Sequence, residues 1–388
     1  MAVMLAAPTV AGAQNAPPPP PGAPPAPPPQ IEHGSVAPTP VDPAVTPARL
    51  SYLHGAVSFW RPGADDWTPA ALNTPLAPGD ALYTGPAGNV EIQVGPQAFV
   101  RAAQDTQLGL DNQEADFVQV RVPLGHVAID VGQLPQGSAI EVDTPNGAFT
   151  IERPGYYRVD VTGEWAALAV HRGGHASVTT ASGGDTPIPA GQQALVSGSD
   201  APRVDLRPAL AFDAWDQWNQ ARTTQLRQGE SARYVAGSVY GTETLDQYGT
   251  WQADESYGRV WLPTSVAVGW VPYSTGRWIW DSRFGWTWLD DAPWGWAPYH
   301  YGRWVFVRSR WAWAPGPIIV RPVYAPALVV FLGGRTVGRP LAWAPLGWGE
   351  PVIPWWGRPG FVGVVTWAGW GGPRVVNNVV VNRTTVNV

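Results

Sequence analysis

The sequence contains no cysteine and no lysine. The absence of cysteine excludes disulfide bonds, thiolate nucleophiles and cysteine-ligated zinc or iron–sulfur sites. All 24 basic residues are therefore arginines, set against 30 acidic residues, and the net charge is −6. An acidic chain without a basic run lacks the phosphate contacts that dominate affinity for nucleic acids, so we expect no nucleic-acid partner.

Long apolar runs are also missing. The longest candidate, residues 317–333, is interrupted by Arg321 and several prolines, so we expect no membrane-spanning helix. Residues 1–13 are apolar and end in an Ala-x-Ala-like site, which is typical of a secretory signal peptide without its basic start. An ordinary alanine-rich start is the alternative. We expect an exported protein, located in the periplasm, on the cell surface or outside the cell.

Glycine (44) and proline (43) are abundant, which argues against long helices and favours short strands joined by turns. Residues 14–47 form a proline-rich spacer that cannot pack a core. From 48 to 200, apolar and polar residues alternate in short runs such as 89–94 and 157–161. This period of two predicts an all-β domain, either a sandwich or a solenoid.

Several residues of this domain stand at predicted turns and strand ends, namely Gly79, Asp80, Thr84, Thr144, Pro145 and Gly147. Their order and spacing, with Gly88-x-Val90-x-Ile92 and Gly155-x-Tyr157-x-Val159, resemble the FecR domain of bacterial envelope proteins. The resemblance implies a β fold in which these residues are structural. Signalling by FecR itself depends on a cytoplasmic segment and a membrane helix that are not recognisable here. The signalling role of FecR is therefore not carried over. Our alternative hypothesis is a signalling or regulatory scaffold that senses a partner through the FecR-like domain.

Residues 208–232 carry apolar side chains at loosely helical spacing and predict one short helix that joins two modules. The second module, 245–316, is a tryptophan-rich repeat. Gly-x-Trp recurs at 249–251, 276–278 and 302–304, and a second tryptophan follows 9 or 10 residues later. A fixed period indicates a repeat architecture, and we predict β-meander units. Residues 317–373 form a Pro/Gly/Trp-rich extension, and 374–388 form a Val/Asn tail.

Alternation within the repeat strands aims tryptophan rings at one face. These rings are either a hydrophobic core or an exposed stacking platform for cell-wall glycan or an envelope protein. The candidate ligand-binding residues are Trp278, Trp280, Trp286, Trp288, Trp294, Trp296, Trp304, Arg277 and Arg303. The second half resembles the uncharacterised tryptophan-rich region that often follows a FecR domain in proteobacterial secreted proteins. That resemblance implies export and supplies no activity.

Chemistry-bearing clusters are sparse. His171 and His175 flank a predicted turn and share no helical face, so we expect no metal and no cofactor. Asp290-Asp291 fits a turn better than a paired acid and base. A glycan hydrolase, with a partner carboxylate among Glu243, Asp246, Asp254 and Glu255, is the third hypothesis. We expect the protein not to be an enzyme.

Overall fold

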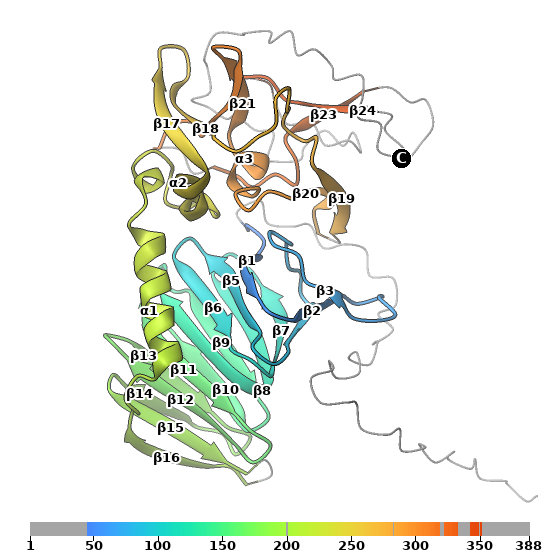
Figure 1. Cartoon of the computed structure of the whole chain (residues 1–388). Helices are drawn as coiled ribbons and strands as arrows, with labels where there is room; N and C mark the ends of the chain where they lie inside the picture. The colour runs from blue at the N-terminus through green and yellow to red at the C-terminus, as the bar shows by residue number, and fades with distance from the viewer. Residues whose placement is uncertain are drawn as a thin grey trace, which may run out of the picture.

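The computed structural model describes residues 45–198, 201–281, 283–318, 322–332, 342–348 and 350. Strands dominate the described chain, and the fold is all-β as predicted (Figure 1). The predicted signal peptide at 1–13, most of the spacer at 14–47, most of the extension at 317–373 and the tail at 374–388 lie outside the described residues.

The first module contains sixteen strands. They are β1 (Arg49–His54), β2 (Val57–Trp60), β3 (Thr68–Pro69), β4 (Ala81–Thr84), β5 (Asn89–Gly95), β6 (Ala98–Ala102), β7 (Thr106–Gln113), β8 (Phe117–Val131), β9 (Ala139–Thr144), β10 (Gly147–Ile151), β11 (Gly155–Val161), β12 (Trp165–His171), β13 (His175–Thr179), β14 (Asp185–Pro189), β15 (Gln192–Ser197) and β16 (Arg203–Pro208). The module thus runs slightly beyond its predicted end at residue 200.

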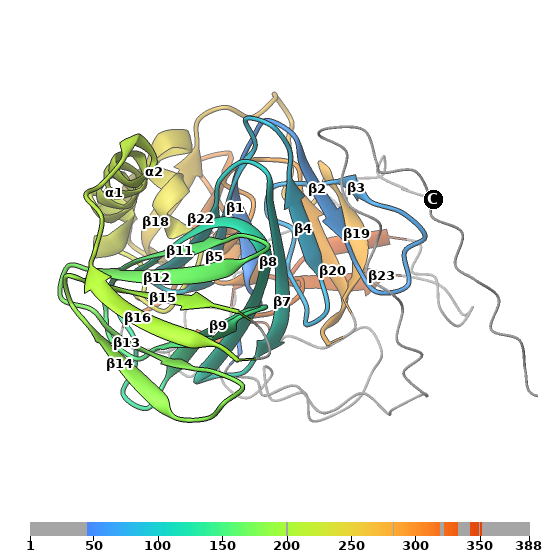
Figure 2. The same cartoon turned by 90° about the horizontal axis from the view of Figure 1, so that it is seen from below.

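These strands form two sheets of a sandwich that share β8 (Figure 2). Sheet A has the order β1-β5-β6-β8-β11-β12-β15-β16, and sheet B has the order β3-β2-β4-β7-β8-β9-β10-β13-β14. Neighbouring strands are antiparallel except for the parallel pair of β8 and β9. The apolar residues of both sheets pack between them in one core. Of the two predicted architectures, the structure is the sandwich.

Strand β8 can belong to both sheets because it bends at Gly125. Residues 117–121 pair with β9 in sheet B, and residues 125–131 pair with β11 in sheet A. Gly125 has φ +112, and a Cβ there would lie 2.4 Å from Thr106 Oγ1, so the bend requires glycine. The residues of β8 that belong to the core change from even numbers (118, 120 and 122) to odd numbers (127, 129 and 131) across the bend, so both halves face the core.

One helix of fourteen residues, α1 (Ala214–Arg227), follows β16 and covers the outer face of sheet A. It is shorter than the predicted 208–232. Asp213 and Asp216 form a capping box that starts the helix after residue 213. The buried positions of α1 are Asp216, Asn219, Thr223 and Leu226, which is a mostly polar face. Of the apolar side chains at helical spacing in 208–232, Leu226 is the one that α1 buries.

The second module is built from hairpins around an aromatic core. Its elements are η1 (Glu230–Arg233), η2 (Thr242–Thr244), α2 (Leu245–Tyr248), β17 (Gly249–Asp254), β18 (Gly258–Pro263), β19 (Gly276–Asp281), β20 (Gly285–Asp290), α3 (Ala297–His300), β21 (Arg303–Val307), β22 (Arg310–Ala314), β23 (Val329–Leu332) and β24 (Ala342–Pro345). Each Gly-x-Trp repeat is one hairpin: β17–β18, β19–β20 or β21–β22.

We predicted β-meander units, and each repeat is an antiparallel hairpin, but the three hairpins do not join in one sheet. The first and third join in the sheet β17-β18-β22-β21, whereas β19–β20 remains a separate two-stranded sheet. The reason is the core between them, because Trp261, Trp288 and Trp313 from the three hairpins all belong to one buried cluster. The hairpins therefore meet through side chains more than through strand edges.

The two modules contact each other directly through residues far apart in sequence. Thr46 Oγ1 lies 2.9 Å from the Tyr301 hydroxyl, and Tyr240 donates to Val94 O at 3.1 Å. Arg49, buried at the start of β1, forms an ion pair with Glu243. Asn73 donates to Ala292 O at 3.0 Å. The segment that enters β1 is thus enclosed by both modules.

Candidate functional site

The glycine of each Gly-x-Trp repeat lies beneath an indole ring of the opposite strand. A Cβ on Gly249, Gly276 or Gly302 would stand 2.2, 2.8 or 2.4 Å from a ring atom of Trp261, Trp288 or Trp313, respectively. Real Cβ atoms do not approach other atoms so closely. The repeat therefore needs glycine at this position because the ring occupies the space of a side chain.

The same three tryptophans are fully buried, and each donates its indole N–H. Trp261 Nε1 donates to Leu245 O at 3.0 Å, and Trp313 Nε1 donates to Tyr301 O at 2.8 Å. Trp288 Nε1 donates to Asp290 Oδ2 at 3.1 Å. A buried indole without a partner would lose a hydrogen bond to water. These three rings therefore serve the fold and are not available to a ligand.

Two cross-strand pairs stand on the same face of each hairpin, an inner pair next to the core and an outer pair next to the turn. The inner pairs are Trp251 with Trp261, Trp278 with Trp288, and Trp304 with Trp313. The outer pairs are Ala253 with Arg259, Trp280 with Trp286, and Phe306 with Trp311. The inner pairs pack against the core, whereas the outer pairs lie beyond it. Aromatic side chains therefore reach solvent at the tips of the second and third hairpins.

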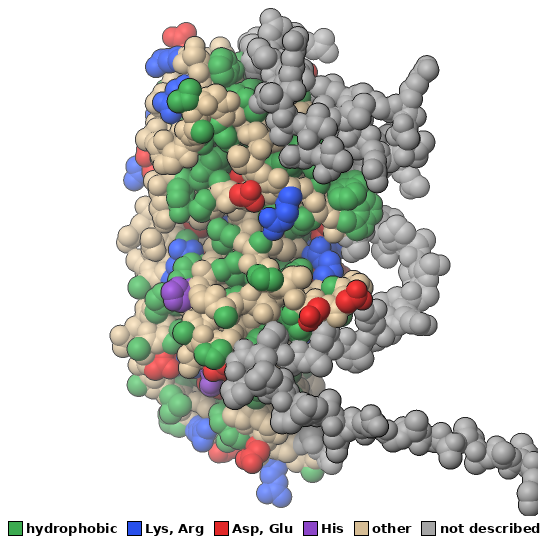
Figure 3. Space-filling model, turned by 45° about the vertical axis from the view of Figure 1, so that its right-hand side comes forward, with side chains coloured by type: hydrophobic (Ala, Val, Ile, Leu, Met, Phe, Trp, Pro, Cys, Tyr) green, Lys and Arg blue, Asp and Glu red, His purple; other side chains and the backbone are tan. Residues whose placement is uncertain are grey.

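The tip of β19–β20 carries the most exposed tryptophans of the described chain. Trp280 is 55% exposed and Trp286 is 37% exposed. Their ring centroids are 5.5 Å apart with the planes at 80°, an edge-to-face pair that leaves one ring face open. Figure 3 shows hydrophobic side chains protruding at the level of β19 and β20. This tip is the candidate binding site.

An arginine of the first module holds the hairpin tip in place. Arg61 Nη1 donates to Trp280 O at 3.2 Å. The Arg61 guanidinium is itself paired with both carboxylate oxygens of Asp80, at 2.8 and 2.6 Å. Asp80 is buried, and burial raises the pKa of its carboxyl. The turn at Gly79-Asp80 is thereby connected to the backbone of the exposed tryptophan.

The structure places most predicted site residues in the interior. Trp288, Trp294, Trp296, Trp304 and Arg303 are buried, Trp278 is half-buried, and Trp280, Trp286 and Arg277 are exposed. Of the two alternatives for the rings, burial favours the hydrophobic core for Trp288, Trp294, Trp296 and Trp304, and leaves Trp280 and Trp286 for an exposed platform.

The two arginines do not flank the exposed rings. Arg303 donates to Gly302 O and Glu350 O, and burial lowers its pKa to about 10. Arg277 is one residue out of step with Trp278 and Trp280, so it lies on the opposite face of β19. There it stands 3.4 Å from Asp291.

The residues that carry the FecR resemblance lie at turns and strand ends. Gly79, with φ +94, and Asp80 precede β4, and Thr84 ends β4. Thr144 and Gly147 close a two-residue turn that contains Pro145, and Thr144 Oγ1 donates to Gly147 O at 2.7 Å. Pro145 stands within this turn, where no ladder N–H is needed.

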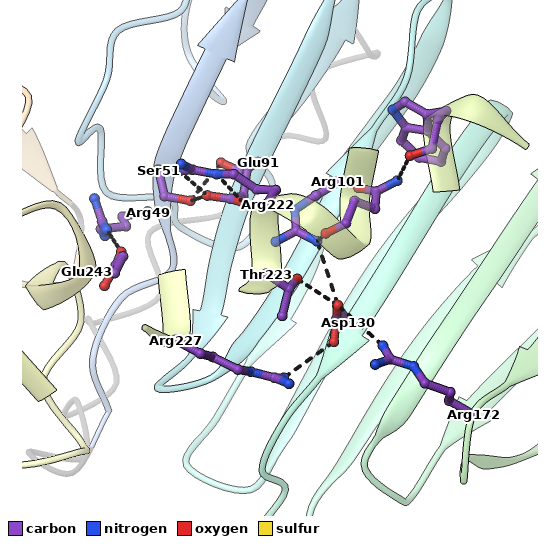
Figure 4. A network of polar contacts seen from close by, with 12 residues as sticks. Arg49, Ser51, Glu91, Arg101, Asp130, Arg172, Arg222, Thr223, Arg227 and Glu243 are labelled. Atoms are coloured by element: carbon purple, nitrogen blue, oxygen red, sulfur yellow. Dashed lines mark hydrogen bonds and ion pairs between the residues drawn. The ribbon is translucent and has the colours of Figure 1, made fainter. Parts of the chain in front are cut away.

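A buried charged network that sequence reasoning missed lies between sheet A and α1 (Figure 4). Glu91 accepts from Arg101 Nε at 2.8 Å and from Arg222 Nη2 at 3.1 Å. Asp130 accepts from Thr223 Oγ1 at 2.7 Å and lies 3.5 Å from Arg227. The guanidiniums hold the pKa of Glu91 below its usual value despite burial, which by itself raises it. The network fastens α1 to the sheet.

A groove opens beside the entry segment. It encloses about 130 Å³. Most of its lining comes from the first module, including Val45, Phe117 and Leu134, while Ser238, Tyr240 and Pro322 complete it. Its charged lining residues, Glu114 and Asp116, are both acidic.

Four of the carboxylates considered for a hydrolase accept hydrogen bonds within the fold, namely Glu243 from Arg49, Asp246, Asp254 and Asp290. Asp290 is buried, and burial raises its pKa to about 7 while the N–H groups of Ala292 and Trp288 oppose the rise. Asp246 accepts from Ser231, and Asp254 accepts from Ser256 N.

Three comparisons complete the description. Residues 242–350 match the model of a family of unknown function, DUF6600. A search among curated proteins finds no match. Two crystal structures of a proposed anti-sigma factor from Parabacteroides distasonis are similar at a TM-score of 0.29 and 14% identity, over 33% of this chain and 59% of that chain. The match thus spans less than two thirds of that protein. None of the described helices is both long and apolar enough to cross a membrane.

Proposed function

We propose that the protein is an exported, non-enzymatic envelope protein whose second module binds cell-wall polysaccharide at the tip of β19–β20. The observation that carries the proposal is the exposed pair Trp280 and Trp286, at the outer end of a hairpin whose inner tryptophans are buried. An open indole face suits the apolar face of a sugar ring, and exposing large rings to water is unfavourable unless a ligand covers them.

The rigidity of the tip supports the same proposal. The inner pair anchors the hairpin in the core, and Arg61 binds the backbone of Trp280 from the first module. A ring held in place loses little freedom when a ligand stacks on it, so more of the contact energy remains as affinity. Export is proposed from the signal-like residues 1–13.

The test is binding of the full chain to peptidoglycan and to soluble polysaccharides in affinity gels. Trp280→Ala should weaken retention by up to about tenfold, because one stacked ring is worth about 0.5–1.5 kcal/mol. Leu210→Ala is the matched control, since Leu210 is 69% exposed and lies outside the hairpins. Equal retention of both variants, or no retention of the wild type, would refute glycan binding.

A second candidate function is a regulatory scaffold that binds an envelope protein through the FecR-like module. The groove beside Val45 favours it, because it offers apolar walls and an acidic rim. Ala115→Arg would place a large cation in the groove. Loss of one envelope protein from pull-downs with this variant, and not with Trp280→Ala, would support the scaffold over the glycan-binding protein.

A further inference from the structure

Among the described residues, strand β16 leaves one edge of sheet A unpaired. It is the last strand of the sheet order and pairs with β15 on one side only. Figures 1 and 2 show no described segment along its other side. At the same end of the sandwich, β14 of sheet B contains Pro187 and Pro189, which cannot donate to a further strand. Between Arg203 and Arg207, β16 has no proline.

The ladder with β15 shows which backbone groups of β16 are free. Ala209 N donates to Gly191 O, one residue beyond the pair of Gln192 and Pro208. Hydrogen-bonded pairs alternate in an antiparallel ladder, so Arg207, Asp205 and Arg203 direct their backbone groups at β15. The backbone N–H and C=O groups of Val204 and Leu206 therefore point away from the sheet.

The hydrophobic core is also open at this edge. Val204 and Leu206 lie opposite the buried Val196 and Ala194, so their side chains face the core. Val204 is half-buried, but Leu206 remains 41% exposed because the sheet ends beside it. A further strand in line with sheet A would cover it.

Charges alternate along the outward face of β16, where Arg203, Asp205 and Arg207 are all exposed. The charges of two copies are complementary when the second β16 runs antiparallel to the first with Leu206 opposite Leu206. Asp205 of each copy then faces Arg207 of the other. A register centred on Asp205 would place like charges opposite each other, which is unfavourable. A register centred on Val204 would place Leu206 beside Pro202, so the two exposed leucines would not meet.

We propose that the protein forms a symmetric dimer in which β16 pairs with β16 of a second copy, in the register centred on Leu206. Sheet A then continues across both molecules. The contact is a strand of six residues on each side, so the interface is small and the dimer depends on concentration. The inference does not rest on glycan binding, although a dimer would present two hairpin tips to one polymer.

The test is sedimentation equilibrium of the full chain with charge-reversal variants. Asp205→Arg and Arg207→Asp should each weaken dimerisation at least about tenfold, because each reversal creates two repulsive pairs by symmetry. An equimolar mixture of the two variants should restore the dimer, because both cross-strand pairs become attractive again. Asp185→Arg, which reverses a charge on the proline-containing β14, is the matched control and should dimerise like the wild type.

Several outcomes would overturn the proposal. They are a wild-type chain that stays monomeric up to about 1 mM, a dimer that survives Asp205→Arg, or a variant mixture that stays monomeric. Far-ultraviolet circular dichroism of each variant separates loss of pairing from loss of folding. Leu206→Asp, which places two carboxylates at the centre of the interface, supplies an independent second variant with the same expected loss.

Discussion

Replacement of Gly276 by alanine tests whether the repeat glycines are required by the rings above them. A Cβ at this position would lie 2.5 Å from Leu289 O, 2.8 Å from Trp288 Cζ2 and 3.0 Å from Asp290 Cα. Two of these neighbours are backbone atoms, which cannot turn aside, and the third belongs to a fully buried ring. Overpacking of a core costs about 1–3 kcal/mol, and we expect the upper part of that range.

The assay is urea unfolding followed by tryptophan fluorescence, which reports on the second module because the repeat hairpins hold many of the indoles. The matched control is Gly237→Ala, where a Cβ would meet nothing within 4 Å and the backbone is not left-handed. The control should change the free energy of unfolding by less than about 0.5 kcal/mol. If Gly276→Ala unfolded at the same urea concentration as the control, the proposed role of the repeat glycine would be refuted.

Two further predictions concern buried charges. Because burial raises the pKa of Asp290 to about 7, the native state keeps a proton that the unfolded chain releases near pH 4. The contribution of this carboxyl to the free energy of unfolding is therefore fully present below pH 4. It falls by up to about 4 kcal/mol as the pH rises from 4 through 7. Asp290→Asn should flatten this dependence in urea titrations at pH 4.5 and 7.5, and an unchanged slope would contradict it. Glu91→Gln should destabilise the first module by about 3 kcal/mol, since it leaves Arg101 buried beside a neutral group. The same removal of charge at Asp111, whose pair with Arg121 is partly exposed to solvent, should change stability by less than about 1 kcal/mol in the same titration.

The fold class and the hairpin repeats follow from local patterns, which explains why they could be predicted. Alternation at 89–94 becomes β5, with Val90, Ile92 and Val94 in the core. The spacing between the two tryptophans of each repeat becomes the inner pair of a hairpin. Both patterns involve only one or two neighbouring strands, and the pleat of a strand alone determines to which face each side chain points.

The other face of the same strand shows where local patterns fail. Glu91 and Gln93 alternate with the core residues of β5 and read as solvent-exposed, yet both are fully buried. Arg222 covers Glu91, and Gly241 N donates to Gln93. These partners follow about 130 to 150 residues later, so no window along the sequence contains both sides of the contact.

The sequence could not decide which tryptophans are buried and which are exposed, for a related reason. Alternation correctly places Trp278 and Trp280 on one face, but it cannot distinguish the inner position from the outer one. That difference arises where Trp288, Trp294 and Trp304 meet in the core between hairpins. The distance of each tryptophan from the hairpin turn could have indicated its exposure, because the pair next to the turn projects beyond the core.

The enclosed entry segment has a consequence for the order in which the chain can fold. Thr46 and Tyr301 are in contact across 255 residues, and Arg49 and Glu243 across 194. A nascent chain therefore produces β1 long before the residues that enclose it exist. Closing so large a loop is slow, and contacts of this range lengthen folding times. Strand β1 can pair with β5 as soon as both strands exist, but Arg49 gains its ion-pair partner only with Glu243, and Thr46 gains its hydroxyl contact only with Tyr301. Synthesis of the second module therefore completes the enclosure of the entry segment.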